Sequence, residues 1–327
     1  MIAPLAVSLG DPAGIGPEVV ARSWEKRKEE ALPPFLAVGD LDAVKKVWDG
    51  PLAPIDDPAR AAAAFREALP VWDVADSSAL GTLALAEARN ALDALDLAIG
   101  LAQMGAASGL VTGPVSKSRL YAVGFTHPGQ TEFVAERCGV AGDLIAMMLA
   151  GPSLRVVPVT THIPFIDVPA ALTTEAIVAK GRAAARGLQR QFGIEAPRVA
   201  VAGLNPHAGE DGHLGREEAE IITPAIERLR DEGFTVTGPH SPDIMFSERW
   251  RTNYDVALCM YHDQGLIPLK ALHFDEGINV TLGLPIVRTS PDHGTAFDIA
   301  GKGLADPGAM IAAIRAAGEC AARLAAA

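Results

Sequence analysis

The sequence is short of cysteine, of positive charge and of long apolar runs. Its three cysteines, Cys138, Cys259 and Cys320, are odd in number and far apart, which argues against a disulfide framework and a cysteine-based zinc site. With 28 lysines and arginines against 40 acidic residues, the net charge of −12 excludes binding of nucleic acid or an anionic membrane by bulk electrostatics. No apolar run approaches the roughly 18 residues of a membrane span. We therefore expect no nucleic-acid or membrane partner.

The first residues lack the basic region of a secretory signal, and the apolar start meets Gly10-Asp11-Pro12 early. Together with unpaired cysteines, this favours a reducing, cytoplasmic location. A length of 327 residues exceeds the size at which one hydrophobic core keeps growing, so we expect two domains or lobes. Hydrophobic residues at 49% and charged residues at 21% are ordinary globular values.

Nucleotide-binding fingerprints are also absent. Gly10, Gly14 and Gly16 follow a short apolar strand and precede a helix, but their spacing is neither G-x-G-x-x-G nor that of a P-loop. A tight turn is the favoured interpretation, and an anion site on bare amides is the alternative. Other helical patterns cover 77–103 and the alanine-rich 307–325.

Three apolar strands each finish on a histidine. The segments 156–161, 199–204 and 255–261 lead to His162, His207 and His262, respectively. If these strands are parallel neighbours, their carboxyl ends lie on one rim and the imidazoles can converge on one ion. The alternative is that each histidine only satisfies carbonyl groups in its own loop.

Further polar residues are candidates for a phosphate site. Lys270, Asn279 and Arg288 flank apolar segments and provide two cations and an amide, although scattered lysines and arginines are usually surface charges. Asp243 lies in a turn-rich loop, and Asp263 follows His262 directly. A carboxylate beside a ligating histidine more often orients the imidazole than accepts a substrate proton.

Several longer motifs in this order resemble the 4-hydroxythreonine-4-phosphate dehydrogenase family of pyridoxal phosphate biosynthesis. The motifs are Gly10-Asp11-Pro12-Ala13-Gly14-Ile15-Gly16-Pro17-Glu18, Thr112-Gly113-Pro114, Gly129-Gln130-Thr131-Glu132-Phe133, Thr161-His162, Asn205-Pro206-His207-Ala208-Gly209-Glu210 and Tyr261-His262-Asp263-Gln264-Gly265. The resemblance covers essentially the whole chain.

The resemblance implies an α/β fold like that of the isocitrate and isopropylmalate dehydrogenases. Two α/β/α lobes would enclose an active site in the cleft between them. The first lobe would contain 1–128 and 272–327, with the chain termini and the cofactor loop. The second would contain 129–271, with the metal-binding histidines and the interface of a homodimer whose subunits share the active site.

The reaction implied by the resemblance is an oxidative decarboxylation. The C3 hydroxyl of 4-phosphooxy-L-threonine would be oxidised by NAD or NADP, and loss of carbon dioxide would give 3-amino-2-oxopropyl phosphate for pyridoxine 5'-phosphate synthesis. A divalent ion, zinc or else magnesium, cobalt or manganese, would be held by His162, His207 and His262 and would activate the hydroxyl.

The same resemblance implies roles for the remaining residues. Substrate would be bound by Gln130, Thr131, Lys270, Asn279 and Arg288. The adenosine side of the cofactor would be bound by His293, Gly294, Thr295 and Asp298. Asp243 and Asp263 would be the candidate catalytic carboxylates.

One position departs from the family. Gln130 stands where the best-known members have histidine, and glutamine cannot be cationic or exchange protons near neutral pH. This leaves open a D-threonate or D-erythronate 4-phosphate dehydrogenase of the same family. A non-catalytic protein that binds a metal or ligand on this scaffold is the alternative from another class.

Overall fold

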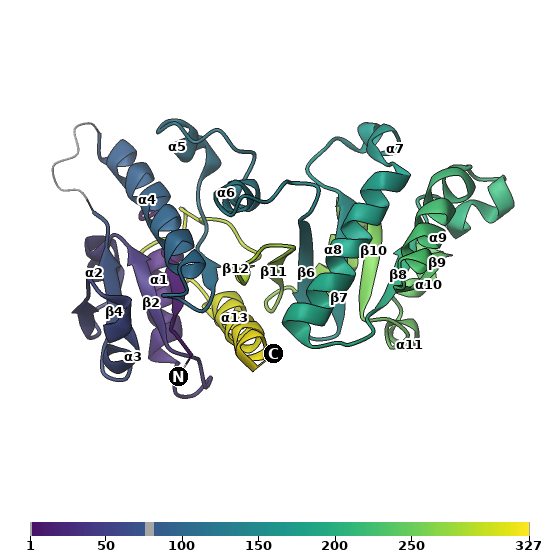
Figure 1. The fold of residues 1–327 in the computed structure, drawn as a ribbon. Helices are drawn as coiled ribbons and strands as arrows, with labels where there is room; N and C mark the ends of the chain where they lie inside the picture. The colour runs from purple at the N-terminus through teal and green to yellow at the C-terminus, as the bar shows by residue number, and fades with distance from the viewer. Residues whose placement is uncertain (1, 76–81, 327) are drawn as a thin grey trace. The chain divides into compact units, whose positions relative to one another are not determined.

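The computed structural model describes residues 2–75 and 82–326, and the chain divides into two compact units. Unit 1 is formed by Met1–Gly139 and Leu284–Ala327, and unit 2 by Val140–Gly283 (Figure 1). These boundaries lie after the predicted ones, so Gln130 and Thr131 belong to unit 1 and Asn279 to unit 2. The assignment of the predicted lobes as domains stays a prediction.

Unit 1 is built on parallel strands. They run in the order β3-β4-β2-β1-β5-β12, with every neighbouring pair parallel. Because such strands are covered on both faces, β1 and β2 are almost wholly apolar, whereas β12 begins with the buried Arg288. The strands are β1 (Leu5–Ser8), β2 (Phe35–Gly39), β3 (Leu52–Pro54), β4 (Leu69–Asp73), β5 (Leu110–Thr112) and β12 (Arg288–Pro291).

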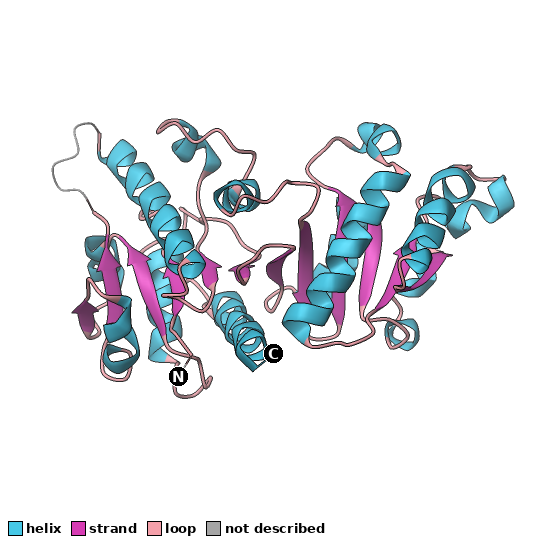
Figure 2. Ribbon diagram, viewed as in Figure 1, coloured by secondary structure: helices cyan, strands magenta, loops and turns pink. Residues whose placement is uncertain are grey.

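Helices pack against these strands (Figure 2). The long helix α4 contacts β1 and β2, whereas α13 contacts β12 and α1. The predicted helix over 77–103 corresponds to α4, although 77–81 lie outside the described residues. The helices of unit 1 are α1 (Gly16–Glu25), α2 (Leu41–Val47), η1 (Pro58–Arg60), α3 (Ala61–Ala64), α4 (Leu83–Gln103), α5 (Lys117–Tyr121), α6 (Gln130–Arg137) and α13 (Gly308–Ala326).

Unit 2 has a mixed sheet in the order β11-β6-β7-β10-β8-β9. The pairs of β6 with β11 and β7 are antiparallel, and the rest are parallel. The three strands predicted to end on histidines are therefore parallel neighbours. The strands are β6 (Ala146–Gly151), β7 (Leu154–Thr160), β8 (Arg198–Ala202), β9 (Thr235–His240), β10 (Val256–Tyr261) and β11 (Ile278–Leu282).

Helices cover both faces of this sheet. Gly181 of α8 lies against Leu258 of β10, whereas Gly265 of α12 lies against Cys259. Since consecutive strand residues point to opposite faces, α8 and α12 lie on opposite sides, and the predicted α/β class is confirmed. The helices are η2 (Phe165–Asp167), α7 (Val168–Ala171), α8 (Thr174–Phe192), η3 (Pro206–Gly212), η4 (Glu218–Ile222), α9 (Thr223–Asp231), α10 (Pro242–Met245), α11 (Glu248–Arg251) and α12 (His262–His273).

Among the helices of residues 2–75 and 82–326, none combines the length and apolar character needed to cross a membrane.

Candidate functional site

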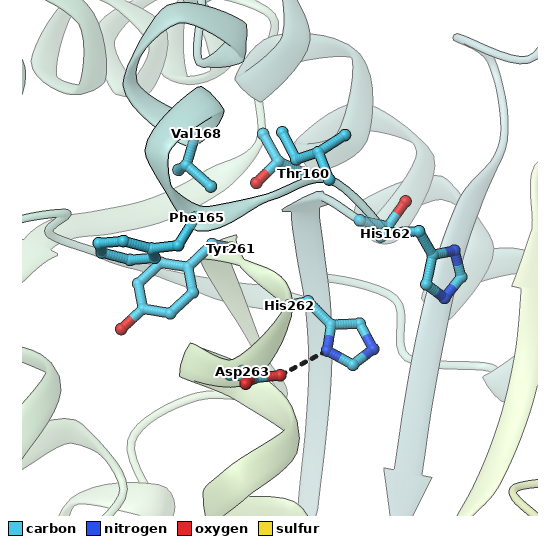
Figure 3. A pocket seen from close by; sticks show the side chains of 9 residues that line it. Thr160, His162, Phe165, Val168, Tyr261, His262 and Asp263 are labelled. Carbon is cyan, nitrogen blue, oxygen red and sulfur yellow. Dashed lines mark hydrogen bonds and ion pairs between the residues drawn. The ribbon is translucent and has the colours of Figure 1, made fainter.

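The carboxyl ends of β7 and β10 form a pocket in unit 2 (Figure 3). It has a volume of about 200 Å³ and is lined by residues of both strand ends, including His162, His262 and Asp263. His262 begins α12 directly after β10, and His162 follows β7 by two residues. The two imidazole ring centroids are 5.5 Å apart, so the fold brings two of the three predicted ligands together.

Buried hydrogen bonds fix these strand ends. Thr160 Oγ1 donates to Met260 O over 2.8 Å, which joins the end of β7 to β10. Gln264 accepts from Met260 N over 2.6 Å and donates to Gly203 O over 2.7 Å, which joins β10 to the end of β8. Sequence reasoning gave Gln264 no role of its own. The signal that could have found it is an amide in the first turn of a helix that follows a strand directly.

Asp263 orients the imidazole of His262. Its Oδ1 lies 2.7 Å from His262 Nδ1 (Figure 3), although the Asp263 side chain is 67% exposed. If Nδ1 carries the proton it donates to this carboxylate, and Nε2 keeps a lone pair for a ligand. The contact is the geometry expected of an orienting carboxylate, and the catalytic assignment of Asp263 stays a prediction.

His207 lies in η3, which follows β8 at the same edge of the sheet. Asp243 of α10 lies close enough to His207 for the two side chains to interact electrostatically. A hydrogen bond from the Ser241 hydroxyl lowers the pKa of Asp243 most, and the charge of His207 lowers it further. A carboxyl with a lowered pKa is a weaker proton acceptor, and the assignment of Asp243 as a catalytic carboxylate stays a prediction.

The histidines of unit 2 offer nitrogen donors for a metal ion. Within residues 2–75 and 82–326, no group of three or more His, Cys, Asp or Glu side chains is placed to hold a metal ion. His162 and His262 form a pair of nitrogen donors of the kind that zinc and cobalt accept. His207 shares their edge of the sheet without joining a three-member group. The three-histidine metal site therefore stays a prediction.

Arg288 occupies a buried polar position in unit 1. It begins β12, is 3% exposed, and donates to Thr112 Oγ1 over 2.8 Å and to Thr131 Oγ1 over 3.4 Å. Burial lowers the pKa of Arg288 to about 10, so the guanidinium stays charged at neutral pH. A buried guanidinium beside two hydroxyls provides N–H and O–H groups that can donate hydrogen bonds to phosphate oxygens.

The other predicted substrate residues fall into two places. Gln130 begins α6 and donates from Nε2 to Gly113 O over 3.1 Å, while its buried Oε1 has no hydrogen-bond partner among the described residues. It neighbours Thr131 in unit 1. Asn279 of β11 and Lys270 of α12 belong to unit 2. The Oδ1 atom of Asn279 is also buried without such a partner in the described part of the chain.

The predicted cofactor loop follows β12 and rests on the glycine turn. Thr295 O accepts from Ile15 N over 2.9 Å, and a Cβ at Gly14 would lie 2.9 Å from that oxygen. A Cβ at Gly16 would lie 1.9 Å from Leu9 O, so the turn requires glycine there. The glycine turn is thus the tight turn that the sequence favours. His293, Gly294 and Asp298 complete the loop, and Asp298 is exposed.

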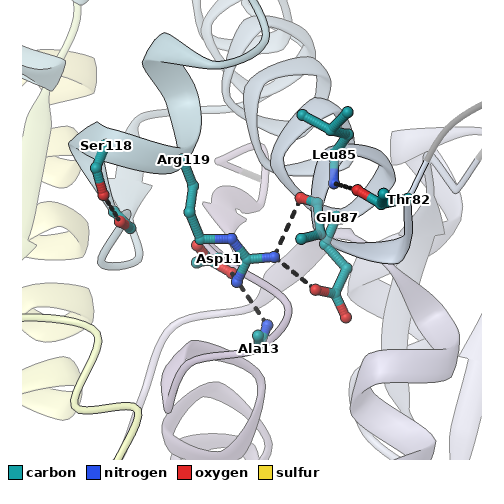
Figure 4. Close-up of polar contacts among 9 residues, drawn as sticks. Asp11, Ala13, Thr82, Leu85, Glu87, Ser118 and Arg119 are labelled. Atoms are coloured by element: carbon teal, nitrogen blue, oxygen red, sulfur yellow. Dashed lines mark hydrogen bonds and ion pairs between the residues drawn. The ribbon is translucent and has the colours of Figure 1, made fainter.

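Hydrogen bonds and ion pairs stabilise the turn between β1 and α1 (Figure 4). Asp11 accepts from Arg119 over 2.8 Å and from Ala13 N over 3.1 Å, and Arg119 also donates to Glu87 of α4. Burial raises the pKa of Asp11 more than these contacts lower it. The Arg119 guanidinium lies 5.7 Å from the centroid of Phe297 in the cofactor loop. Sequence reasoning missed Arg119 and Glu87, because no local pattern links them to Asp11.

Comparisons with known proteins show the family of this chain. The profile of a family described as Pyridoxal phosphate biosynthetic protein PdxA matches residues 31–317. The 4-hydroxythreonine-4-phosphate dehydrogenase of Erythrobacter litoralis is 56% identical over 326 residues, which cover 98% of this chain and 97% of that protein. The enzyme of that name from Zymomonas mobilis is 54% identical over 313 residues, covering 95% and 93%. The crystal structure of 4-hydroxythreonine-4-phosphate dehydrogenase from Klebsiella pneumoniae gives a TM-score of 0.86 at 37% identity, covering 98% and 99%.

Proposed function

The chain belongs to the family of the Pyridoxal phosphate biosynthetic protein PdxA, and from this premise we propose that it is an oxidative decarboxylase of 4-phosphooxy-L-threonine. Membership confirms the resemblance predicted from the sequence and makes the chain an enzyme of the 4-hydroxythreonine-4-phosphate dehydrogenase family. In the proposed reaction the C3 hydroxyl is oxidised with NAD or NADP. Loss of carbon dioxide then gives 3-amino-2-oxopropyl phosphate.

The observation that carries the proposal is the pair of imidazoles at the ends of β7 and β10. We assign His162, His207 and His262 to a divalent ion, zinc or else magnesium, cobalt or manganese. When bound, such an ion supplies Lewis acidity that favours ionisation of the hydroxyl and stabilises negative charge during decarboxylation. Asp263 orients His262 for this role through their 2.7 Å contact.

We assign binding of the substrate phosphate to Arg288 and Thr131, supported by Lys270 and Asn279. A buried guanidinium brings a fixed charge and forked donors, which discriminate in favour of a phosphate over a neutral group. The Oε1 of Gln130 is buried without a partner among the described residues and can accept a hydrogen bond, so it suits a donor group of the substrate. These contacts act on the bound substrate and on the transition state alike.

We assign the cofactor to the loop that contains His293, Gly294, Thr295 and Asp298. When bound there, NAD or NADP would supply the hydride acceptor for oxidation at C3. The loop rests on the tight turn at Gly14, and this turn is braced by the buried Asp11 and Arg119. A homodimer whose subunits share the active site is part of the same proposal.

Substrate turnover tests this function. Purified protein is supplied with NAD or NADP, zinc, and either 4-phosphooxy-L-threonine, D-threonate 4-phosphate or D-erythronate 4-phosphate, and cofactor reduction is followed optically. The proposal expects the highest kcat/KM with 4-phosphooxy-L-threonine and release of carbon dioxide. No reduction with that substrate would refute it.

The runner-up is a dehydrogenase for the phosphorylated sugar acids. It is favoured by Gln130, because an amide cannot supply the positive charge of the histidine found in the best-known members. Preference for either sugar acid in the same assay would support it. A protein that turns over none of the three, and that neither holds nor responds to divalent metals, would support the non-catalytic alternative.

A further inference from the structure

The segment that carries His207 has a left-handed backbone. All residues from His207 to Asp211 have φ between 43° and 80°, and Gly209 is the one glycine among the five. Residues with a Cβ disfavour this region, so contacts from outside the segment must hold it in place.

Glu218 binds the residues that lead into this segment and packs against the segment itself. Its side chain is buried, with the residue 6% exposed, and its Oε1 accepts from Leu204 N and from Asn205 N, each over 2.8 Å. Its Oε2 accepts from Asn205 Nδ2 over 3.0 Å. A Cβ at Gly209 would lie 2.5 Å from this Oε2, so the left-handed segment packs directly on the carboxylate.

The position of Glu218 is itself fixed. It begins η4, a π-helical turn that leads into α9, and Thr174 Oγ1 of α8 donates to Ile221 O in that turn over 3.0 Å. Short π-helical turns are rare and frequently occur at functional sites. The turn that carries Glu218 is therefore tied to α8 and continuous with α9.

We propose that Glu218 is a positioning residue that holds His207 at the edge of the sheet for ion binding. This inference rests on the proposed function for the identity of the ion. A carboxylate has no N–H group, so it accepts all three hydrogen bonds at once. Glutamine has the same shape but would point an N–H toward either Asn205 Nδ2 or the two backbone N–H groups.

Hydrogen exchange and zinc binding test the proposal together. In Glu218→Ala, we expect the amides of Leu204 and Asn205 to exchange at least about 10-fold faster, because they lose their acceptor. In Glu218→Gln they should exchange faster by a smaller factor, because the amide keeps one oxygen but adds an N–H group that has no acceptor. We expect zinc affinity, measured by calorimetry, to fall about 10- to 100-fold, with kcat recovering in excess zinc. Glu220→Gln is the matched control, since Glu220 lies on the same turn and is exposed, with an ion pair to Arg216.

Gly209→Ala gives a second test, because its methyl group would displace the carboxylate while leaving the charge present, although the φ of 80° there also strains the segment directly. It should reproduce both effects, and Glu218→Gln, which adds no backbone strain, decides the matter if Glu218→Ala does not fold. Unchanged exchange at Leu204 and Asn205, or faster exchange with unchanged zinc affinity, would overturn the positioning role. A wild-type protein that binds no zinc would contradict the proposed function instead, while the exchange rates would still report whether Glu218 holds the segment.

Discussion

At the residue scale, the site depends on polar side chains whose partners fix their orientation. Asp263 contacts His262 Nδ1, and the hydroxyls of Thr112 and Thr131 contact Arg288. Each contact presets a donor or acceptor before a ligand arrives, which lowers the ordering cost of binding. Substitutions at these positions should therefore alter binding of the ion or the substrate, each with its own kinetic signature.

Asp263→Asn separates an orienting role from a catalytic one. The amide keeps the size of the side chain but loses the charge that favours the Nδ1 proton on His262. We expect zinc affinity to fall about 10- to 100-fold, and kcat to recover when zinc is saturating. Asp275→Asn, at an exposed position after α12, serves as the control. A loss of kcat that saturating zinc does not restore would make Asp263 the proton acceptor.

Arg288→Lys tests phosphate binding. Lysine keeps the charge but loses the fork that reaches both Thr112 and Thr131. A charge-assisted hydrogen bond contributes about 1.5–3 kcal/mol, so KM for the phosphorylated substrate should rise about 10- to 150-fold. The value of kcat should change less, because phosphate contacts act equally in ground and transition states. Steady-state kinetics measure this, with exposed Arg323→Lys as control; an unchanged KM would contradict it.

At the element scale, close approaches of the backbone position the cofactor loop. The turn between β1 and α1 packs against Pro114 and Thr295, and a Cβ at Gly10 would lie 2.3 Å from Pro114 O. Glycine is therefore needed where the strand end meets two other segments. The turn is a structural requirement of unit 1 before any cofactor binds.

A pair of glycine substitutions tests this requirement. In Gly16→Ala the new methyl group would lie 1.9 Å from Leu9 O, and we expect the free energy of unfolding to fall by more than about 2 kcal/mol. Gly100→Ala in α4 is the matched control. Its methyl group meets no atom within 4 Å, so helix propensity should stabilise the protein by about 0.5–1 kcal/mol. Urea denaturation measures both, and equal stabilities of the two variants would contradict the account.

A contact between the starts of β8 and β10 makes the stability of the protein depend on pH. Asp255, before β10, accepts from the backbone and guanidinium of Arg198 at the start of β8. Burial alone would raise its pKa, but these hydrogen bonds outweigh burial and hold the pKa below 3.8. The contribution to stability is therefore complete above 3.8 and is lost as pH falls through the folded-state value.

Asp255→Asn should consequently destabilise the protein at neutral pH, since the amide accepts fewer of these hydrogen bonds. Its free energy of unfolding should also vary less with pH below about 4 than that of the wild type. Urea titrations across the acid range measure this. A variant with the wild-type slope in that range would show that the pair does not contribute to acid unfolding.

The helices and strands were largely predictable from the sequence, because the residue pattern that indicates each of them is local. The buried strands β7, β8 and β10 are apolar runs, and their polar ends are visible in the sequence. The left-handed conformation at His207 was not predictable, since it involves residues other than glycine and depends on Glu218, which follows along the chain. Likewise, Asp11 and Arg119 are 108 residues apart in the sequence, and no local pattern predicts their contact.

At the scale of the whole molecule, the two units carry different parts of the proposed chemistry. Unit 2 contains the three histidines, Lys270 and Asn279, and unit 1 contains Thr131, Arg288 and the loop from His293. The family and the α/β class follow from motifs spread over the whole chain, so they were predictable from the sequence. The unit boundaries were less so, because no change of composition marks them.

The central claim is that His162, His207 and His262 bind one ion that activates the substrate hydroxyl. The most direct measurement is the divalent-ion content and affinity of the purified protein beside three variants, His162→Ala, His207→Ala and His262→Ala. We predict that the wild type binds zinc or cobalt, and that each variant stays folded by circular dichroism but loses both the ion and the oxidation of 4-phosphooxy-L-threonine. A folded His207→Ala protein that retains the ion and the activity would contradict the claim.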